Sequence, residues 1–144
     1  MTENQKCIVW TRPRPLPSNG KVRVLVVDDN KNAAQALAAY LSLEGMEVQD
    51  AGGCDEALQI VSAWRPDVLV LDIMMPLRDG FETARMLRAR FHEAILIVAF
   101  TAMDSTHVVA NAAGRLFDGY CQKGVSPARL MRVLGDLWCP SPRS

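Results

Sequence analysis

Short apolar segments alternate with longer amphipathic ones along most of this chain. Five segments of four to six residues, most of them rich in Val, Ile or Leu, have the length of buried strands. Between them, apolar residues recur at intervals of three and four, as at Ala33, Leu37 and Tyr40, which predicts helices. The expected strands are 22–27, 46–51, 68–71, 95–100 and 119–122, and the expected helices are 31–44, 57–64, 81–91, 105–113 and 127–137.

The strict alternation of strand and helix decides the fold class. Parallel strands need a crossover between them, and a helix is the usual crossover. Right-handed crossovers place helices on both faces of one sheet. The pattern therefore predicts an α/β protein with a doubly wound, five-stranded parallel sheet.

The ends of the chain have a different composition. Pro13, Pro15 and Pro17 alternate with Arg and Leu before Ser18-Asn19-Gly20, so we expect residues 1–20 to be a flexible Pro/Arg-rich tail. One domain then covers 21–138, and 139–144 is a short C-terminal tail. A length of 144 residues fits a single core.

Charge and cysteine content narrow the function classes. Basic and acidic residues number 16 each, so nothing predicts a nucleic-acid or membrane surface. The arginines in and before the 81–91 helix are interpreted as a solvated face. No segment resembles a membrane span or a signal peptide, and the four scattered cysteines suggest reduced thiols in a cytoplasmic protein. The arginines in and before the 81–91 helix are Arg78, Arg85, Arg88 and Arg90.

Polar residues follow four of the five expected strands. Asp28 and Asp29 follow the first, Asp72 the third, Thr101 the fourth and Lys123 the fifth. Each could have a local role, such as capping a helix. Because the carboxyl ends of parallel strands share one edge of the sheet, we expect these side chains to converge there.

The residue types limit the chemistry of that edge. Clustered carboxylates repel each other unless a cation neutralises them, and their hard oxygens suit Mg²⁺. A carboxylate beside such a metal can attack phosphorus, with Lys123 and Thr101 contacting the phosphoryl oxygens. The set predicts a phosphorylatable aspartate, Asp72.

The surrounding motifs resemble those of response-regulator receiver domains of two-component signalling. The resemblance covers about residues 21–138 and implies a flavodoxin-like fold with strand order 2-1-3-4-5. It rests on Val24–Asn30, on Leu71–Pro76 followed by Asp79-Gly80, on Thr101-Ala102, and on Tyr120 three residues before Lys123.

The resemblance implies a role for each residue of the cluster. Asp72 would accept a phosphoryl group from the phosphohistidine of a histidine kinase or phosphotransfer protein, and Lys123 would pair with the phosphoryl oxygens. Asp29 and Asp72, with the backbone carbonyl of Met74, would hold Mg²⁺. Asp28 would act mainly through a coordinated water.

The resemblance also implies a switch and its partners. Thr101 would move to the phosphoryl group, and the Tyr120 ring would then turn inward. This would remodel the face formed by the fourth helix, fifth strand and fifth helix. Partners at that face would be a downstream protein or a second copy of the chain.

Two positions depart from the family pattern. Gly124 follows Lys123 where the family usually has a cis proline, so we expect a trans peptide bond and an altered loop. Leu116 replaces a glycine that usually ends the fourth helix. We therefore expect that helix to stop early, or residues 115–117 to form an unusual connection.

Three other functions remain open. A Mg²⁺-dependent phosphohydrolase with an Asp nucleophile would need a second carboxylate two residues after Asp72, where Met74 stands. A flavin module would need a Ser-, Thr- or Gly-rich loop after 22–27. A receiver-like binding module without phosphorylation would not require the acidic set. We expect a signalling switch with no external substrate, either stand-alone or part of a hybrid kinase.

Overall fold

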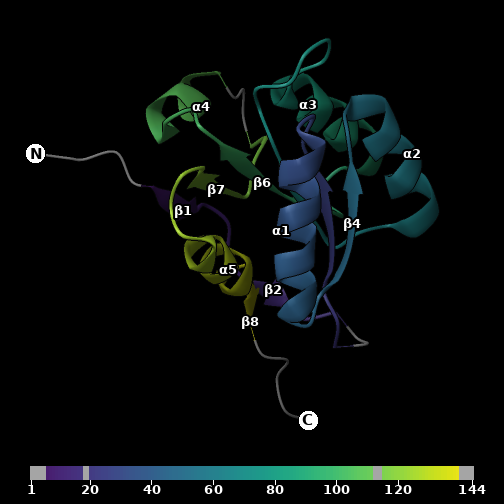
Figure 1. Cartoon of the computed structure of the whole chain (residues 1–144), viewed down its shortest axis with the longest axis vertical. Helices are drawn as coiled ribbons and strands as arrows, with labels where there is room; N and C mark the ends of the chain where they lie inside the picture. The colour runs from purple at the N-terminus through teal and green to yellow at the C-terminus, as the bar shows by residue number, and fades with distance from the viewer. Residues whose placement is uncertain (1–5, 18–19, 112–114, 140–144) are drawn as a thin grey trace, which may run out of the picture.

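The computed structural model describes residues 6–17, 20–111 and 115–139. A six-stranded sheet forms its centre, and helices pack around it (Figure 1). The strand order is β1-β7-β6-β5-β3-β4, and a separate two-stranded sheet pairs β2 with β8. The strands are β1 Cys7–Val9, β2 Arg14–Pro15, β3 Arg23–Val27, β4 Glu47–Ala51, β5 Val68–Leu71, β6 Leu96–Thr101, β7 Gly119–Gln122 and β8 Trp138–Cys139.

The five predicted strands are parallel and lie in the predicted order. They are β3, β4, β5, β6 and β7, and their spatial order β4-β3-β5-β6-β7 corresponds to 2-1-3-4-5. Every residue of β5 is buried, as expected for a central strand covered on both faces. The α/β doubly wound prediction is therefore confirmed, with one additional antiparallel strand at an edge.

Helices cover both faces of the sheet. Alternate residues of the central strands point to opposite sides, so Leu69 and Leu71 belong to one core and Val68 and Val70 to the other. The first core is completed by α2, α3 and α4, and the second by α1 and α5. The helices are α1 Lys31–Leu43, α2 Cys54–Trp64, α3 Gly80–Phe91, α4 Ser105–Asn111 and α5 Pro127–Asp136.

Two described parts of the expected flexible tail, 7–9 and 14–15, pair with other strands, whereas residues 1–5 and 18–19 lie outside the described residues. Residues Cys7–Val9 form β1, which pairs antiparallel with β7, and Arg14–Pro15 pair with Trp138–Cys139. The edge of β7 has backbone groups that need partners, and a short apolar segment can supply them. Domain packing thus includes much of the segment before residue 21, and Cys139 belongs to β8. The remainder of the C-terminal tail, 140–144, lies outside the described residues.

The loop after Lys123 has the predicted trans geometry. None of the peptide bonds in the described ranges is cis. Gly124 has a φ of 96°, in the left-handed region that glycine adopts without a Cβ clash. A glycine here gives the altered turn that leads into α5.

The connection between α4 and β7 is held by an arginine that we expected to be solvated. The helix α4 ends at Asn111, and the predicted continuation to 113 falls outside the described residues. Arg88 donates to the Leu116 carbonyl at 3.2 Å and forms an ion pair with buried Asp118 at 2.6 Å. Asp118 also accepts from the Ile97 amide at 2.9 Å. The interpretation of Arg88 as part of a solvated face is therefore wrong.

Candidate functional site

Three carboxylates meet at the carboxyl edge of the sheet. Asp28 and Asp29 follow β3, Asp72 follows the neighbouring strand β5, and one oxygen from each lies within 4.8 Å of the others. Asp28 and Asp72 are buried, and Asp29 is exposed. Adjacent parallel strands of matching register end side by side, which explains this convergence.

Backbone hydrogen bonds fix the two buried carboxylates. The Asn30 amide donates to Asp28 Oδ1 at 2.9 Å, and the Met74 amide donates to Asp72 Oδ1 at 3.1 Å. The Asp72 amide itself donates to the Val27 carbonyl at 2.9 Å, continuing the ladder to the site. The acidic side chains are thus oriented by the loops that leave β3 and β5.

Lys123 brings a positive charge into the cluster from the end of β7. Its Nζ lies 2.7 Å from Asp28 Oδ2 and 3.3 Å from Asp72 Oδ2. Burial alone would lower the pKa of Lys123, but the hydrogen bond to Asp28 and the charge of Asp72 raise it overall. Lys123 therefore remains protonated and partly neutralises the carboxylates.

The Asp72 carboxyl is shifted towards its neutral form. Burial raises the pKa of Asp72 above its ordinary value, and the charge of Asp28 acts in the same direction. The Lys123 ammonium and the Met74 amide oppose the shift without cancelling it. A second cation beside the cluster would favour the ionised carboxylate.

The donor set fits Mg²⁺. Three carboxylate oxygens at one edge of the sheet are hard ligands, and Asp29 is open to solvent, which leaves room for the waters that Mg²⁺ retains. The predicted contribution of the Met74 carbonyl is not tested by these contacts. Asp28, Asp29 and Asp72 are the residues that would hold the ion.

Thr101 and Tyr120 lie on the neighbouring strands β6 and β7. Thr101 is buried, and its hydroxyl accepts from the Met103 amide at 3.3 Å. The Lys123 amide donates to the Thr101 carbonyl at 2.8 Å, joining these two strand ends. The backbone therefore places Thr101 beside Lys123 at the same edge.

The Tyr120 ring is fully buried. Its hydroxyl donates to the Met103 carbonyl at 2.6 Å, and its ring centroid lies 6.3 Å from that of Trp10. Burial, followed by the charge of Asp104, raises the pKa of Tyr120 to about 12. The ring occupies an inward position; its predicted movement with Thr101 stays a prediction.

The loop after Asp72 requires a glycine at Gly80. A Cβ at that position would lie 2.5 Å from the Asp72 carbonyl oxygen and 2.6 Å from Ile73 Cα. Asp79 caps α3 by accepting from the Glu82 amide at 2.9 Å. The Asp79-Gly80 pair thus turns the chain tightly beneath the site.

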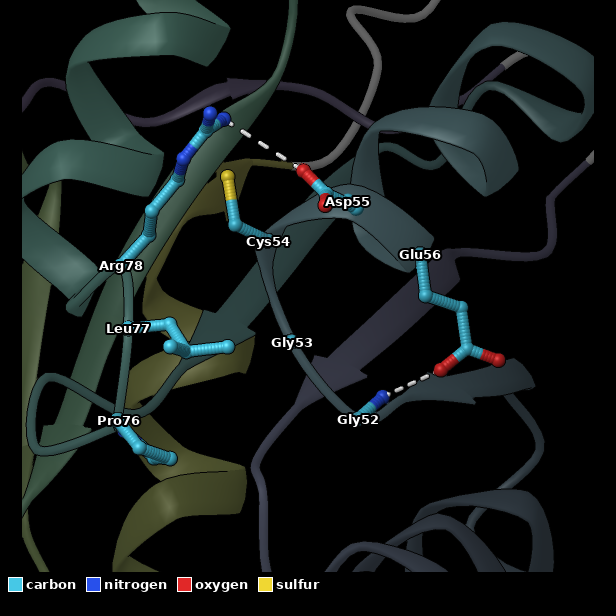
Figure 2. Close-up of a pocket in the computed structure, with 8 residues that line it drawn as sticks. All are labelled: Gly52, Gly53, Cys54, Asp55, Glu56, Pro76, Leu77 and Arg78. Carbon is cyan, nitrogen blue, oxygen red and sulfur yellow. Dashed lines mark hydrogen bonds and ion pairs between the residues drawn. The ribbon is translucent and has the colours of Figure 1, made fainter.

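A groove beside the site, lined by Leu77, was not predicted from the sequence. This groove, of about 440 Å³, lies between residues 52–56, which join β4 to α2 and form the first turn of α2, and the loop 76–78 (Figure 2). Leu77 is fully exposed with a φ of 66°, and Met74 is 60% exposed. Pro76 and Arg78-Asp79-Gly80 indicate a turn around Leu77, but nothing in the sequence indicates a groove there.

Comparison with known proteins identifies the family. The sequence matches the response regulator receiver domain over residues 24–135. The chain therefore belongs to the response-regulator receiver family of two-component signalling. Along the described residues, no helix has both the length and the apolar character needed to cross a bilayer.

Sequence relatives include the response regulator MprA of Mycobacterium tuberculosis strain H37Rv, which is 44% identical over 84 residues. That alignment covers 58% of this chain and 36% of the relative. The MprA of Mycolicibacterium vanbaalenii is 43% identical over the same length. The chain thus matches about a third of the length of these curated relatives.

Solved structures agree with the family assignment. The Francisella response regulator 1452 receiver domain is 30% identical with a TM-score of 0.71, covering 81% of this chain and 97% of that one. The response regulator TrrA of Thermotoga maritima, solved in complex with Mg²⁺ and BeF, is also 30% identical, with a TM-score of 0.73. It covers 81% of this chain and 98% of that chain.

Proposed function

We propose that the protein is a phosphoacceptor switch in which Asp72 receives a phosphoryl group from the phosphohistidine of a kinase or phosphotransfer protein. The observation that carries the proposal is the placement of Lys123 within 3.3 Å of Asp72, inside a cluster of three carboxylates. An ammonium beside a carboxylate nucleophile can stabilise the negative charge on the phosphoryl oxygens during transfer.

The transfer would exchange one bond for another. An oxygen of Asp72 forms the new P–O bond while the P–N bond of the donor breaks, and the bonding electron pair returns to the imidazole nitrogen. Mg²⁺ held by the carboxylates would supply positive charge next to the phosphoryl oxygens. Lys123 would hold those oxygens from the β7 side, and Thr101 would donate its hydroxyl to them.

Activation would act through Thr101 and Tyr120. Met103 is hydrogen-bonded to both residues, because its amide donates to the Thr101 hydroxyl and its carbonyl accepts from the Tyr120 hydroxyl. If the Thr101 hydroxyl moves to the phosphoryl group, the loop that contains Met103 would shift, and the Tyr120 hydroxyl with it. The output would be an altered α4–β7–α5 face that binds a downstream protein or a second copy. The proposal includes cytoplasmic location, no direct nucleic-acid contact and no turnover of an external substrate.

Intact-mass measurement tests the proposal. After incubation with Mg²⁺ and a small-molecule phosphodonor such as acetyl phosphate, the wild type should gain one phosphoryl group. Asp72→Asn should gain none, while Asp55→Asn, which changes an exposed aspartate outside the cluster, should behave as wild type.

The same experiment separates the alternatives. An unmodified wild type would support a binding module that works without phosphorylation. Sustained release of phosphate from varied phosphate esters, dependent on Asp72, would support a phosphohydrolase instead.

A further inference from the structure

Two cysteines face each other where the N-terminal strand meets the sheet. Cys7 of β1 is paired with Cys121 of β7, and their Sγ atoms lie 2.6 Å apart. The residues are 114 positions apart in sequence, so the contact depends wholly on the docking of β1. Among the residues described, Cys54 and Cys139 have no such cysteine partner.

The strand register favours a bond between these side chains. The Gln122 amide donates to the Lys6 carbonyl at 2.7 Å, and the Trp10 amide donates to the Asp118 carbonyl at 2.8 Å. Since hydrogen-bonded and non-hydrogen-bonded pairs alternate in an antiparallel ladder, Cys7 and Cys121 form a non-hydrogen-bonded pair. Such pairs bring Cα atoms to about 4.5 Å, within the range that disulfides span.

We propose that Cys7 and Cys121 form a reversible intrachain disulfide, made by exchange with an anionic low-molecular-weight disulfide, which fixes β1 on the edge of β7. The two cysteines lie outside the carboxylate cluster, so the proposal does not require phosphorylation of Asp72.

Solvent exposure and the nearby positive charge make Cys7 the thiol that reacts first with the external disulfide. Cys7 is partly exposed and lines a groove of about 220 Å³ with Arg129 and Arg132 of α5, whereas Cys121 is fully buried. The two arginines give the groove a positive wall, which favours an anionic reagent such as oxidised glutathione. Asp136, which lines the same groove, carries a negative charge that offsets part of the positive charge of the two arginines.

The exchange takes place in two balanced steps. The Cys7 thiolate attacks one sulfur of the reagent, forming a mixed disulfide and releasing one thiolate. Cys121 then gives up its proton and attacks the Cys7 sulfur, releasing the second reagent thiolate, which takes up that proton. Overall, two protein thiols are oxidised and one external disulfide is reduced to two thiols.

Burial and the neighbouring Cys7 raise the pKa of the Cys121 thiol.

Mass spectrometry under non-reducing conditions tests the proposal. The full chain carrying Cys54→Ser and Cys139→Ser, which retains the pair, is equilibrated with oxidised and reduced glutathione at several ratios. We expect the loss of two hydrogen atoms, a linked peptide joining Cys7 to Cys121, and full reversal by dithiothreitol.

Matched variants and a second readout complete the test. Adding Cys7→Ser should abolish the loss of two hydrogens without altering the circular dichroism spectrum. After tryptic cleavage at Lys6 and Lys21 and denaturation, the peptide 7–21 should remain attached only in the oxidised form, since Arg12 and Arg14 both precede proline and are not cut. A stable glutathione adduct on Cys7 alone, or no reaction at any glutathione ratio, would overturn the proposal.

Discussion

The proposed phosphoryl transfer requires Asp72 to be ionised, whereas the buried position of Asp72 in the fold favours the neutral carboxyl. Burial therefore raises the pKa of Asp72 from the ordinary value of 3.8. A group whose pKa is raised on folding stabilises the fold below its ordinary pKa, and that stability is lost as the pH rises through the folded value. Ionised Asp72 thus lowers the free energy of unfolding at neutral pH.

We expect Asp72→Asn to raise the free energy of unfolding at pH 7 without Mg²⁺, by an amount on the order of 1 kcal/mol. The amide removes a buried charge and its repulsion with Asp28, which outweighs the lost pairing with Lys123. Urea unfolding measures the change, and Asp55→Asn is the control. A less stable Asp72→Asn would show that the Lys123 pair dominates.

Tyr120 provides a prediction at alkaline pH. Its pKa is raised from 10.0 to about 12, so the unfolded chain releases the phenol proton at a lower pH than the folded one. Stability from this group is complete below pH 10 and is lost as the pH rises towards 12, by about 2.7 kcal/mol.

Urea unfolding between pH 9 and pH 11.5 should reveal this loss for the wild type, and Tyr120→Phe should reduce the slope. A residual slope is expected, because the pKa of Cys121 is also raised. Equal slopes in both proteins would contradict the assignment to Tyr120.

Among the elements, the parallel sheet was predictable and its edges were not. The strand β5, and the strand β3 after Arg23, are continuous apolar runs, as is β6 up to Thr101. Asp or Thr at the ends of these strands indicated the site before any geometry was known. The strand β1 has only three residues next to a proline-rich stretch. Its pairing partner is more than 100 residues away, and a local pattern does not specify such a contact.

The α4–β7 connection depends on a contact of the same non-local kind. Arg88 alternates with apolar positions on α3 as any solvated arginine would, yet its guanidinium reaches Asp118, Leu116 and Ile95. The signal that could have identified it is an aspartate directly before the β7 strand, where an apolar residue would be expected.

Replacing Arg88 by methionine should destabilise the fold by about 3–5 kcal/mol, because buried Asp118 loses its ionic partner. Thermal or urea unfolding measures the loss. Arg85→Met, at an exposed position of the same helix, should change stability little. Adding Asp118→Asn to Arg88→Met should restore part of the loss, and a double variant that is no more stable would count against a charge effect.

At the scale of the whole molecule, the acidic edge couples folding to cation binding. An ion that binds only the folded chain stabilises it by about 2.7 kcal/mol at a hundredfold excess over its dissociation constant. The three carboxylates come from two strands, so the unfolded chain does not present them together.

We therefore expect Mg²⁺ to raise the melting temperature of the wild type in a concentration-dependent manner. Asp29→Asn should largely remove this response, since it deletes the exposed ligand while leaving the buried pair. Differential scanning calorimetry with Mg²⁺ and with matched ionic strength of NaCl separates site binding from screening. Equal shifts with both salts would argue against a specific site.

The docking of β1 also determines what neighbouring molecules meet at that side of the sheet. Without it, β7 would present a row of open backbone donors and acceptors, which is a template for intermolecular strand addition. With β1 in place, the outermost strand is three residues long and is soon followed by prolines, which cannot donate to a ladder. By covering the edge of β7, β1 should therefore oppose aggregation. The protein should remain unaggregated at concentrations where an uncovered β7 edge would begin to assemble into fibres.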